Sequence, residues 1–338
     1  MNAEHARRLN ELLATRPPIL LIPHKNPDGD AIGSCLGLMH YLQAVGHQVS
    51  VLAPNDFPQF LQWMPGASEV IRFDRQPEAG AGLIREAGLI FTLDFNALDR
   101  SGALAEPLKQ ATAPMVMIDH HQSPDDYATV TYSDPSMSST CEMVYHCIAA
   151  LGGIGKLNAD AASCLYAGLL TDTGSFKFPS TSPITLRIAA DLMERGAVPS
   201  EIHRQIYDTN RPERIQLLGC ALSNLKILPQ YRTAYITLSQ EELDRHNFRK
   251  GDTEGFVNYG LSLDGVILAA IFIENTDEEI VKISLRSQGD FSVNAMARAH
   301  FEGGGHINAA GGRSTESLKE TTLRFESILS EYAKDLQP

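Results

Sequence analysis

Residues 19–34 of the chain read ILLIPHKNPDGDAIGS, and this stretch decides the fold. The continuous apolar run Ile19–Ile22 is typical of a strand that is buried on both faces, as in a parallel sheet. After the polar loop, Asp30 can cap a helix. The apolar residues of that helix recur at helical spacing, and they are Ile32, Leu36, Met39, Leu42 and Val45. Gly46 marks its end. The stretch therefore predicts a strand, a loop and a helix, which is the repeating unit of an α/β fold.

The same alternation continues along the first half of the chain. Further apolar runs predict strands at Val49–Ala53, Leu89–Leu93 and Met115–Ile118. A capping-box pattern at residues 139–142 begins one helix, and a second helical pattern begins at Ala159. Strands that alternate with helices in this way predict a doubly wound parallel sheet.

The pattern changes after residue 181. Residues 182–222 are mostly helical in pattern, and prolines separate the predicted helices. The strands and the helix predicted beyond them are Arg232–Leu238, Val266–Glu274, Ile280–Arg286 and Ala295–His300. We therefore expect a doubly wound domain over residues 1–181, a helical connector over 182–222, and a smaller α/β domain over 223–338.

The composition excludes several classes of protein. The 338 residues include 28 basic and 41 acidic ones, and a formal net charge of −13 disfavours extended contact with duplex DNA. The polar N-terminus is unlike a signal peptide, and no stretch is apolar for long enough to span a bilayer. We therefore expect a cytoplasmic protein without membrane contact. Five cysteines without a Cys-x-x-Cys pair predict buried thiols rather than disulfides or a structural zinc site.

Aspartate and histidine side chains gather where the predicted elements end. The candidate metal ligands and their neighbours are His24, Asp28, Asp30, Asp94, Asp119, His120, His121 and Asp172. In open α/β sheets the carboxyl ends of the strands are where ligands bind. Carboxylates packed into one cleft repel one another unless a cation compensates them. Such ligands, without cysteine, suit manganese or magnesium, with cobalt or iron also possible. A two-metal centre would activate water and stabilise the leaving oxygen of a phosphoryl displacement.

Each position also has a plain structural explanation. Residues 28–30 could form a turn and a helix cap, Asp94 could cap a helix, and Asp172 could lie in a turn. A single histidine is more often a hydrogen-bonded core or surface residue than a ligand. Two adjacent imidazoles at a strand end, however, have little purely structural use. All these residues follow predicted elements of one sheet, and their occurrence together favours metal binding.

A second polar signal lies far downstream, in the run Gly303-Gly304-Gly305-His306. Glycines let backbone amides approach an anion closely, and a flexible turn is the competing explanation. Arg286 is the last residue of a predicted strand and could form a bidentate phosphate contact, or could be an ordinary solvated arginine.

These motifs resemble those of the DHH phosphoesterase family, which is named after the Asp-His-His found here at 119–121. Residues 24–34 resemble the family's first motif, Asp94 resembles the second, and residues 171–174 resemble the fourth. Residues 303–306 resemble the glycine-rich signature of the DHH-associated C-terminal domain. The resemblance covers nearly the whole chain. It implies an active-site cleft between the two domains.

The resemblance also implies a division of roles among the candidate ligands. Two manganese ions would be bound, with magnesium or cobalt as alternatives. The first ion would be held by His24, Asp28 and Asp94. The second would be held by Asp30, Asp94, His120 and Asp172, so that Asp94 bridges the two ions. Asp119 would orient the ligands, and His121 would face the substrate phosphate.

Further residues would bind the substrate if the resemblance holds. They are Arg286, Gly304, Gly305 and His306 in the C-terminal domain. Arg100 corresponds to an arginine that follows the second motif, although an ordinary salt bridge is an equal explanation. Phe95 and Asn96 depart from the smaller or polar residues expected after Asp94, which puts the local substrate contacts in doubt.

Length and domain order look most like the family branch that hydrolyses short oligoribonucleotides to mononucleotides and 3′-phosphoadenosine 5′-phosphate to AMP and phosphate. The partners would then be short single-stranded RNA or small nucleotides, and the family leads us to expect a homodimer. A phosphodiesterase of cyclic di-nucleotides or their linear products is the alternative. A non-catalytic nucleotide sensor would be signalled by a missing metal ligand, and every expected ligand is present.

Overall fold

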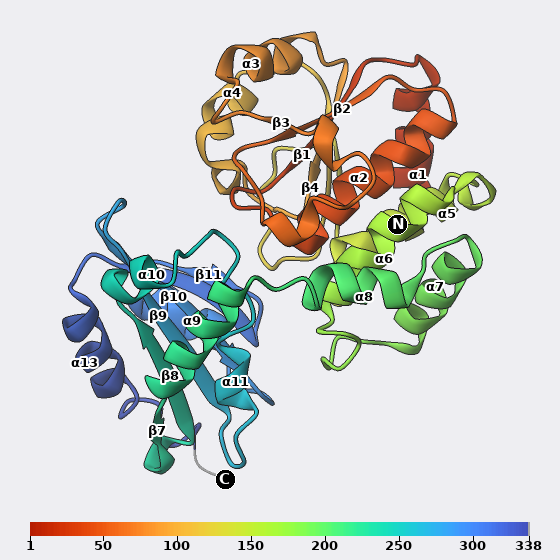
Figure 1. Ribbon diagram of the computed structural model, residues 1–338. Coiled ribbons are helices and arrows are strands. Elements are labelled where there is room, and N and C mark those ends of the chain that lie inside the picture. Colours follow the sequence, from red (N-terminus) through yellow and green to blue (C-terminus); the bar gives the residue numbers. More distant parts are fainter. Residues whose placement is uncertain (337–338) are drawn as a thin grey trace. The chain divides into compact units, whose positions relative to one another are not determined.

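The computed structural model describes residues 1–336, and it divides the chain into two compact units (Figure 1). The first unit spans residues 1–209, and the second takes in the described residues from 210 to 336. The segment predicted to connect two domains is divided between them. Helices α7 (Pro183–Glu194) and α8 (Pro199–Tyr207) belong to the first unit, and α9 (Pro212–Ser223) belongs to the second.

The first unit is built on a six-stranded sheet in the order β3-β2-β1-β4-β5-β6. Every neighbouring pair of strands is parallel. The strands are β1 (Ile19–Pro23), β2 (Val49–Ala53), β3 (Ile71–Arg72), β4 (Leu89–Leu93), β5 (Met115–Asp119) and β6 (Val130–Ser133). This order reverses direction between β1 and β4, which is the topological switch point of a doubly wound fold. The predicted α/β class and parallel sheet are confirmed.

The apolar runs form strands because both faces of the sheet are covered. Leu21 and Phe91 point into one core, and their neighbours Leu20 and Ile90 point into another on the opposite face. The first core is covered by α1 (Ala3–Ala14), α2 (Gly29–Ala44), α5 (Thr140–Ala150) and α6 (Ala159–Asp172). The second is covered by α3 (Pro77–Glu86) and α4 (Ala105–Lys109), on the other side of the sheet (Figure 1). The short 3-10 helices of the chain are η1 (Gln59–Leu61), η2 (Ala67–Glu69), η3 (Leu98–Leu104), η4 (Ile154–Lys156) and η5 (Pro229–Tyr231).

Helices α2 and α6 approach each other closely because glycines line their contact. A Cβ atom added at Gly33 would lie 2.6 Å from the Cys164 carbonyl oxygen, and one at Gly168 would lie 3.1 Å from Asp30 Cα. The same contact brings the first turn of α2 beside the start of α5 and the end of α6. The candidate ligands at residues 30 and 172 lie at these helix ends.

Replacing Gly33 by alanine is therefore expected to destabilise the protein by about 1–3 kcal/mol, the usual cost of overpacking a core. Alanine favours a helix over glycine by only about 1 kcal/mol, so the collision with a backbone carbonyl prevails. The matched control is Gly82→Ala in α3, where only the tip of Arg85 lies near the added Cβ, at 3.9 Å. Urea denaturation should show a lower midpoint for Gly33→Ala and an equal or higher one for the control. Equal midpoints for the two variants would contradict this account of the packing.

The second unit has a mixed six-stranded sheet in the order β11-β12-β10-β9-β8-β7. Its strands are β7 (Lys226–Leu228), β8 (Thr233–Leu238), β9 (Leu268–Asn275), β10 (Ile280–Ser287), β11 (Gly304–Gly305) and β12 (Ala309–Ser314). Only the pair β8–β9 is parallel among its described strands. Helices α12 (Val293–His300) and α13 (Leu318–Ile328) cover one face. Helices α9, α10 (Gln240–Arg245) and α11 (Asn258–Leu261) lie on the other.

Two local predictions need correction. The N-cap of α2 is Asp28 rather than Asp30, because the Asp28 side chain accepts the backbone N–H groups of Asp30 and Ala31. Four of the five cysteines are buried thiols as predicted, whereas Cys220 is only half-buried. No helix among residues 1–336 is long and apolar enough to cross a membrane.

Candidate metal centre

Three strand ends of the first unit bring the polar side chains together. His24 directly follows β1, Asp94 directly follows β4, and Asp119 ends β5 just before His120 and His121. Strands β1, β4 and β5 are neighbours, with the switch point between the first two. The carboxyl edge of the sheet at a switch point is where α/β proteins bind ligands.

The first group of candidate ligands is His24, Asp28 and Asp94. His24 Nε2 lies 3.8 Å from Asp28 Oδ2 and 3.5 Å from Asp94 Oδ2. The other oxygen of Asp28 caps helix α2, so one carboxylate both begins the helix and faces the histidine. Ligand atoms of these three residues all lie within 4.8 Å of one another, as they must to share one cation.

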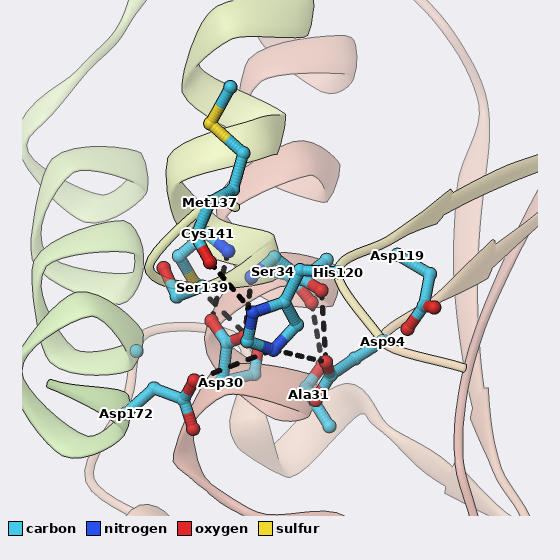
Figure 2. Close-up of polar contacts among 12 residues, drawn as sticks. Asp30, Ala31, Ser34, Asp94, Asp119, His120, Met137, Ser139, Cys141 and Asp172 are labelled. Carbon is cyan, nitrogen blue, oxygen red and sulfur yellow. Dashed lines mark hydrogen bonds and ion pairs between the residues drawn. The ribbon is translucent and has the colours of Figure 1, made fainter. Parts of the chain in front are cut away.

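The second group is Asp30, His120 and Asp172. His120 Nε2 lies 3.8 Å from Asp30 Oδ2 and 3.4 Å from Asp172 Oδ2. Figure 2 shows the Asp30 and Asp172 carboxylates on one side of the His120 ring and the Asp94 carboxylate on the other. These three residues also meet the 4.8 Å condition for sharing one ion.

Asp94 joins the two groups. Its Oδ2 faces His24 at 3.5 Å, and its Oδ1 faces His120 Nε2, also at 3.5 Å. The residue has φ +66°, in the left-handed region that few residues other than glycine adopt. Such a backbone conformation costs free energy and is characteristic of functional sites. The geometry therefore gives Asp94 the position of a carboxylate that bridges two cations.

Both histidines present an Nε2 atom to the carboxylates. Nδ1 of His24 lies 2.8 Å from the Lys25 carbonyl oxygen, and Nδ1 of His120 lies 3.2 Å from that of Met137. A carbonyl only accepts hydrogen bonds, so each Nδ1 carries a proton, and each Nε2 is the nitrogen that would bind a cation in place of a proton. This is the arrangement that usually orients metal-binding histidines.

The electrostatics of the two groups fit divalent cations. Burial and the nearby charges of Asp94 and Asp172 raise the pKa of Asp30 well above its ordinary value. Burial alone would lower the pKa of His24, but its hydrogen bonds to Asp28 and Asp94 outweigh burial and raise it to about 10. Without a cation, the site therefore has to hold protons on buried groups. Metal ions can replace those protons and neutralise the carboxylates.

Asp119 and His121 form a pair beside these two groups. Asp119 is fully buried; its Oδ2 accepts the His121 backbone N–H at 2.9 Å, and its Oδ1 lies 2.7 Å from His121 Nδ1. On the other side of the ring, the Arg100 guanidinium lies 3.3 Å from His121 Nε2. Burial is the main cause that lowers the pKa of His121, and the positive charge of Arg100 lowers it further. Together they outweigh the hydrogen bond to Asp119, which raises the pKa. His121 is therefore a neutral imidazole with a fixed orientation.

The two residues that depart from the family pattern have structural contacts. Phe95 is buried in the core on the α3 side of the sheet. The Asn96 side chain donates to the Gln122 carbonyl at 2.5 Å and so holds the loop after His121.

Sequence reasoning missed the residues that surround the ligands. Thr140 Oγ1 donates to Asp94 Oδ1 at 2.9 Å, and the backbone N–H groups of Thr140 and Cys141 donate to Asp30 at 2.6 and 2.9 Å. The sequence did mark this place as a helix start. Nothing in the pattern indicated which side chains the helix start would meet.

The candidate substrate-binding residues of the second unit lie at one end of its sheet. Arg286 in β10 is paired with Ala309 of β12, and Gly305 is paired with Ala310. His306 forms the turn between β11 and β12, where its N–H donates to the Ala309 carbonyl at 2.7 Å. The Gly305 N–H already donates to Asn294 Oδ1 at 3.0 Å, so this amide is occupied in the structure.

Comparison with known proteins identifies the family. Residues 18–169 match the model of the DHH family, N-terminal domain, and residues 230–335 match the DHHA1 domain. The bifunctional oligoribonuclease and PAP phosphatase NrnA of Thermus thermophilus is 32% identical over 98% of this chain and 95% of its own length. The chain belongs to the DHH family.

Two further relatives show which members of the DHH family this chain resembles over its full length. An exopolyphosphatase-related protein from Bacteroides fragilis has a crystal structure that matches with a TM-score of 0.95 and 38% identity, covering 100% of this chain and 98% of that one. The cyclic-di-AMP phosphodiesterase GdpP of Bacillus subtilis is 26% identical over 96% of this DHH protein but only 49% of its own length. The similarity to NrnA, in contrast, extends over nearly all of both chains.

Proposed function

We propose that this protein is a two-metal phosphoesterase that hydrolyses short oligoribonucleotides to mononucleotides and 3′-phosphoadenosine 5′-phosphate to AMP and phosphate. The observation that carries this proposal is the position of Asp94, whose two oxygens face two separate groups of ligand atoms. The substrate class comes from the full-length similarity to the oligoribonuclease and PAP phosphatase of Thermus thermophilus. We further propose manganese as the ion, a cytoplasmic location and a homodimer.

Each residue has a defined role in this proposal. His24, Asp28 and Asp94 would hold one cation, and Asp94 would share the other with Asp30, His120 and Asp172. Cations bound there would supply Lewis-acid activation of water and neutralise charge on the phosphate oxygens. His121 would face the substrate phosphate, held in orientation by Asp119, and Arg100 would add a positive charge beside it. Arg286, Gly304, Gly305 and His306 would bind the rest of the nucleotide.

The substrate proposal is tested by incubating the purified full chain with manganese and three substrates in separate reactions. These are a labelled RNA dinucleotide, 3′-phosphoadenosine 5′-phosphate and a cyclic di-nucleotide. We expect turnover of the first two, at rates well above that of the third. Rapid cleavage of the cyclic substrate with no turnover of the other two would overturn the proposal and favour the phosphodiesterase alternative.

The role of Asp119 leads to a separate prediction. Asp119→Asn should lower kcat for the dinucleotide by about 10–100-fold, as is typical when the partner of an active-site histidine is lost. An amide nitrogen turned toward His121 Nδ1 cannot accept its proton, and the ring would lose its fixed orientation. Manganese affinity, measured by titration of the metal-stripped protein, should stay close to that of the wild type. A large loss of metal affinity would show instead that Asp119 is itself a ligand.

A further inference from the structure

Residues 137–141, here called the α5 entry segment, contact three of the candidate ligands, His120, Asp94 and Asp30. The Met137 carbonyl oxygen lies 3.2 Å from His120 Nδ1, and the Thr140 hydroxyl donates to Asp94 Oδ1 at 2.9 Å. Thr140 is fully buried, so its hydroxyl is shielded from bulk solvent. Figure 2 shows this segment packed around the His120 ring, on the side away from Asp172.

The same segment holds Asp30 through its backbone. The N–H groups of Thr140 and Cys141 are the first two of the 11-residue helix α5, and they donate to the two oxygens of Asp30 at 2.6 and 2.9 Å. N–H groups in the first turn of a helix have no partner within the helix, and they favour negative charge. The start of α5 therefore holds both oxygens of Asp30 in place and favours negative charge on this carboxylate.

The hydroxyl of Thr140 fixes the orientation of the bridging carboxylate. It donates to Asp94 Oδ1, the oxygen that faces His120, and this leaves Oδ2 directed at His24. Rotation of the carboxylate would break that hydrogen bond and leave a buried hydroxyl without an acceptor, which is unfavourable. Thr140 thereby keeps one oxygen of Asp94 directed toward His120 and the other toward His24.

Glu142 holds the α5 entry segment in place through hydrogen bonds. Its Oε2 accepts hydrogen bonds from the Ser138 backbone N–H at 3.3 Å, from the Ser138 hydroxyl, and from the Thr185 hydroxyl at 2.9 Å. The Glu142 side chain is only 3% exposed. A buried carboxylate with three donors on one oxygen is a rigid support for the loop that leads into Thr140.

We propose that Thr140 is a positioning residue that presets Asp94 to bridge two divalent cations, with the α5 entry segment held in place by Glu142. This inference rests on the proposed function, because it assigns a role only if the two groups bind cations. It predicts that the Thr140 hydroxyl raises metal affinity without touching the substrate.

The test compares Thr140→Val with Thr140→Ser in the metal-stripped full chain. Valine keeps the shape of the side chain and the backbone N–H groups that bind Asp30, so only the hydroxyl on Asp94 is lost. Manganese affinity, measured by calorimetric titration, should fall by about 10–100-fold for Thr140→Val, the usual effect of losing a residue that orients a metal ligand. Thr140→Ser should retain the wild-type affinity. Saturating manganese should restore most of the kcat of Thr140→Val.

Thr92→Val is the matched control, because Thr92 is equally buried and its hydroxyl is bonded to Tyr127 on the opposite face of the sheet. This control should lose stability but not metal affinity. Wild-type affinity in Thr140→Val, or an equal loss in Thr140→Ser, would overturn the inference while leaving the proposed function intact. Failure of the wild-type chain itself to bind manganese would overturn the metal centre and, with it, both proposals.

Discussion

Replacing Asp94 by asparagine is expected to lower hydrolysis of an RNA dinucleotide by at least about 10³-fold. The two oxygens of Asp94 face different groups of ligand atoms, so the variant loses a ligand for one cation and negative charge for both. A catalytic metal ion contributes several kcal/mol to the stabilisation of the transition state, and each 1.36 kcal/mol corresponds to a factor of about ten in rate.

The matched control for this variant is Asp99→Asn in the same unit. The Asp99 side chain is 81% exposed and pairs with Lys109 on the surface, so its loss should leave the rate unchanged. The rates are measured with labelled dinucleotide at saturating manganese. If Asp94→Asn kept most of the wild-type rate, the metal centre would have to lie elsewhere.

Removal of divalent cations with a chelator is expected to abolish hydrolysis and to destabilise the protein. Manganese at about 100 times its dissociation constant should raise the free energy of unfolding by about 2.7 kcal/mol, because it binds only the folded state. Urea denaturation with and without manganese measures this difference. Asp94→Asn should show a much smaller difference, which separates specific binding from a general salt effect.

The stabilisation by manganese should also increase with pH. In the metal-free protein, burial lowers the pKa of His24, but hydrogen bonds to Asp28 and Asp94 outweigh burial and raise it from 6.5 to about 10. A proton on His24 Nε2 has to leave before that nitrogen can bind a cation, so the dissociation constant should fall by about tenfold per pH unit for each proton displaced.

The metal-free protein should show the opposite trend with pH. Because the pKa of His24 is raised in the folded state, its protonation contributes stability that is fully present below pH 6.5. That contribution is lost as the pH rises toward about 10. A manganese effect on stability that does not vary with pH would contradict the assignment of His24 as a ligand.

The sequence predicted the parts of this fold that depend on local pattern. Continuous apolar runs identify buried parallel strands, and a strand end fixes where the next polar side chains lie. His24, Asp94 and His120 follow β1, β4 and β5 in this way, so their convergence at one edge of the sheet could be expected. Asp172 was harder to place, because it ends a helix rather than a strand.

Contacts between distant segments could not be predicted in the same way. Asp30 and Thr140 are 110 positions apart, and they meet only because glycines let α2 pack against α6 and α5. The sequence pattern pointed to Asp30 as the cap of helix α2. In the structure Asp30 is bonded to the start of α5, and Asp28 caps the helix.

The glycine run near the C-terminus shows the same limit. The sequence left two explanations open, a backbone that binds an anion and a flexible turn, and it did not predict that Gly304 and Gly305 form a strand beside β12. A Cβ atom at Gly303 would lie 2.0 Å from the Gly311 carbonyl oxygen, so a close approach of two backbones requires that glycine.

Anomalous diffraction from crystals grown with manganese tests the central claim most directly. Two peaks are predicted in the first unit, one among His24, Asp28 and Asp94 and the other among Asp94, Asp30, His120 and Asp172. A different Asp94 oxygen should be directed toward each peak. A single peak, or peaks that do not involve Asp94, would contradict the account.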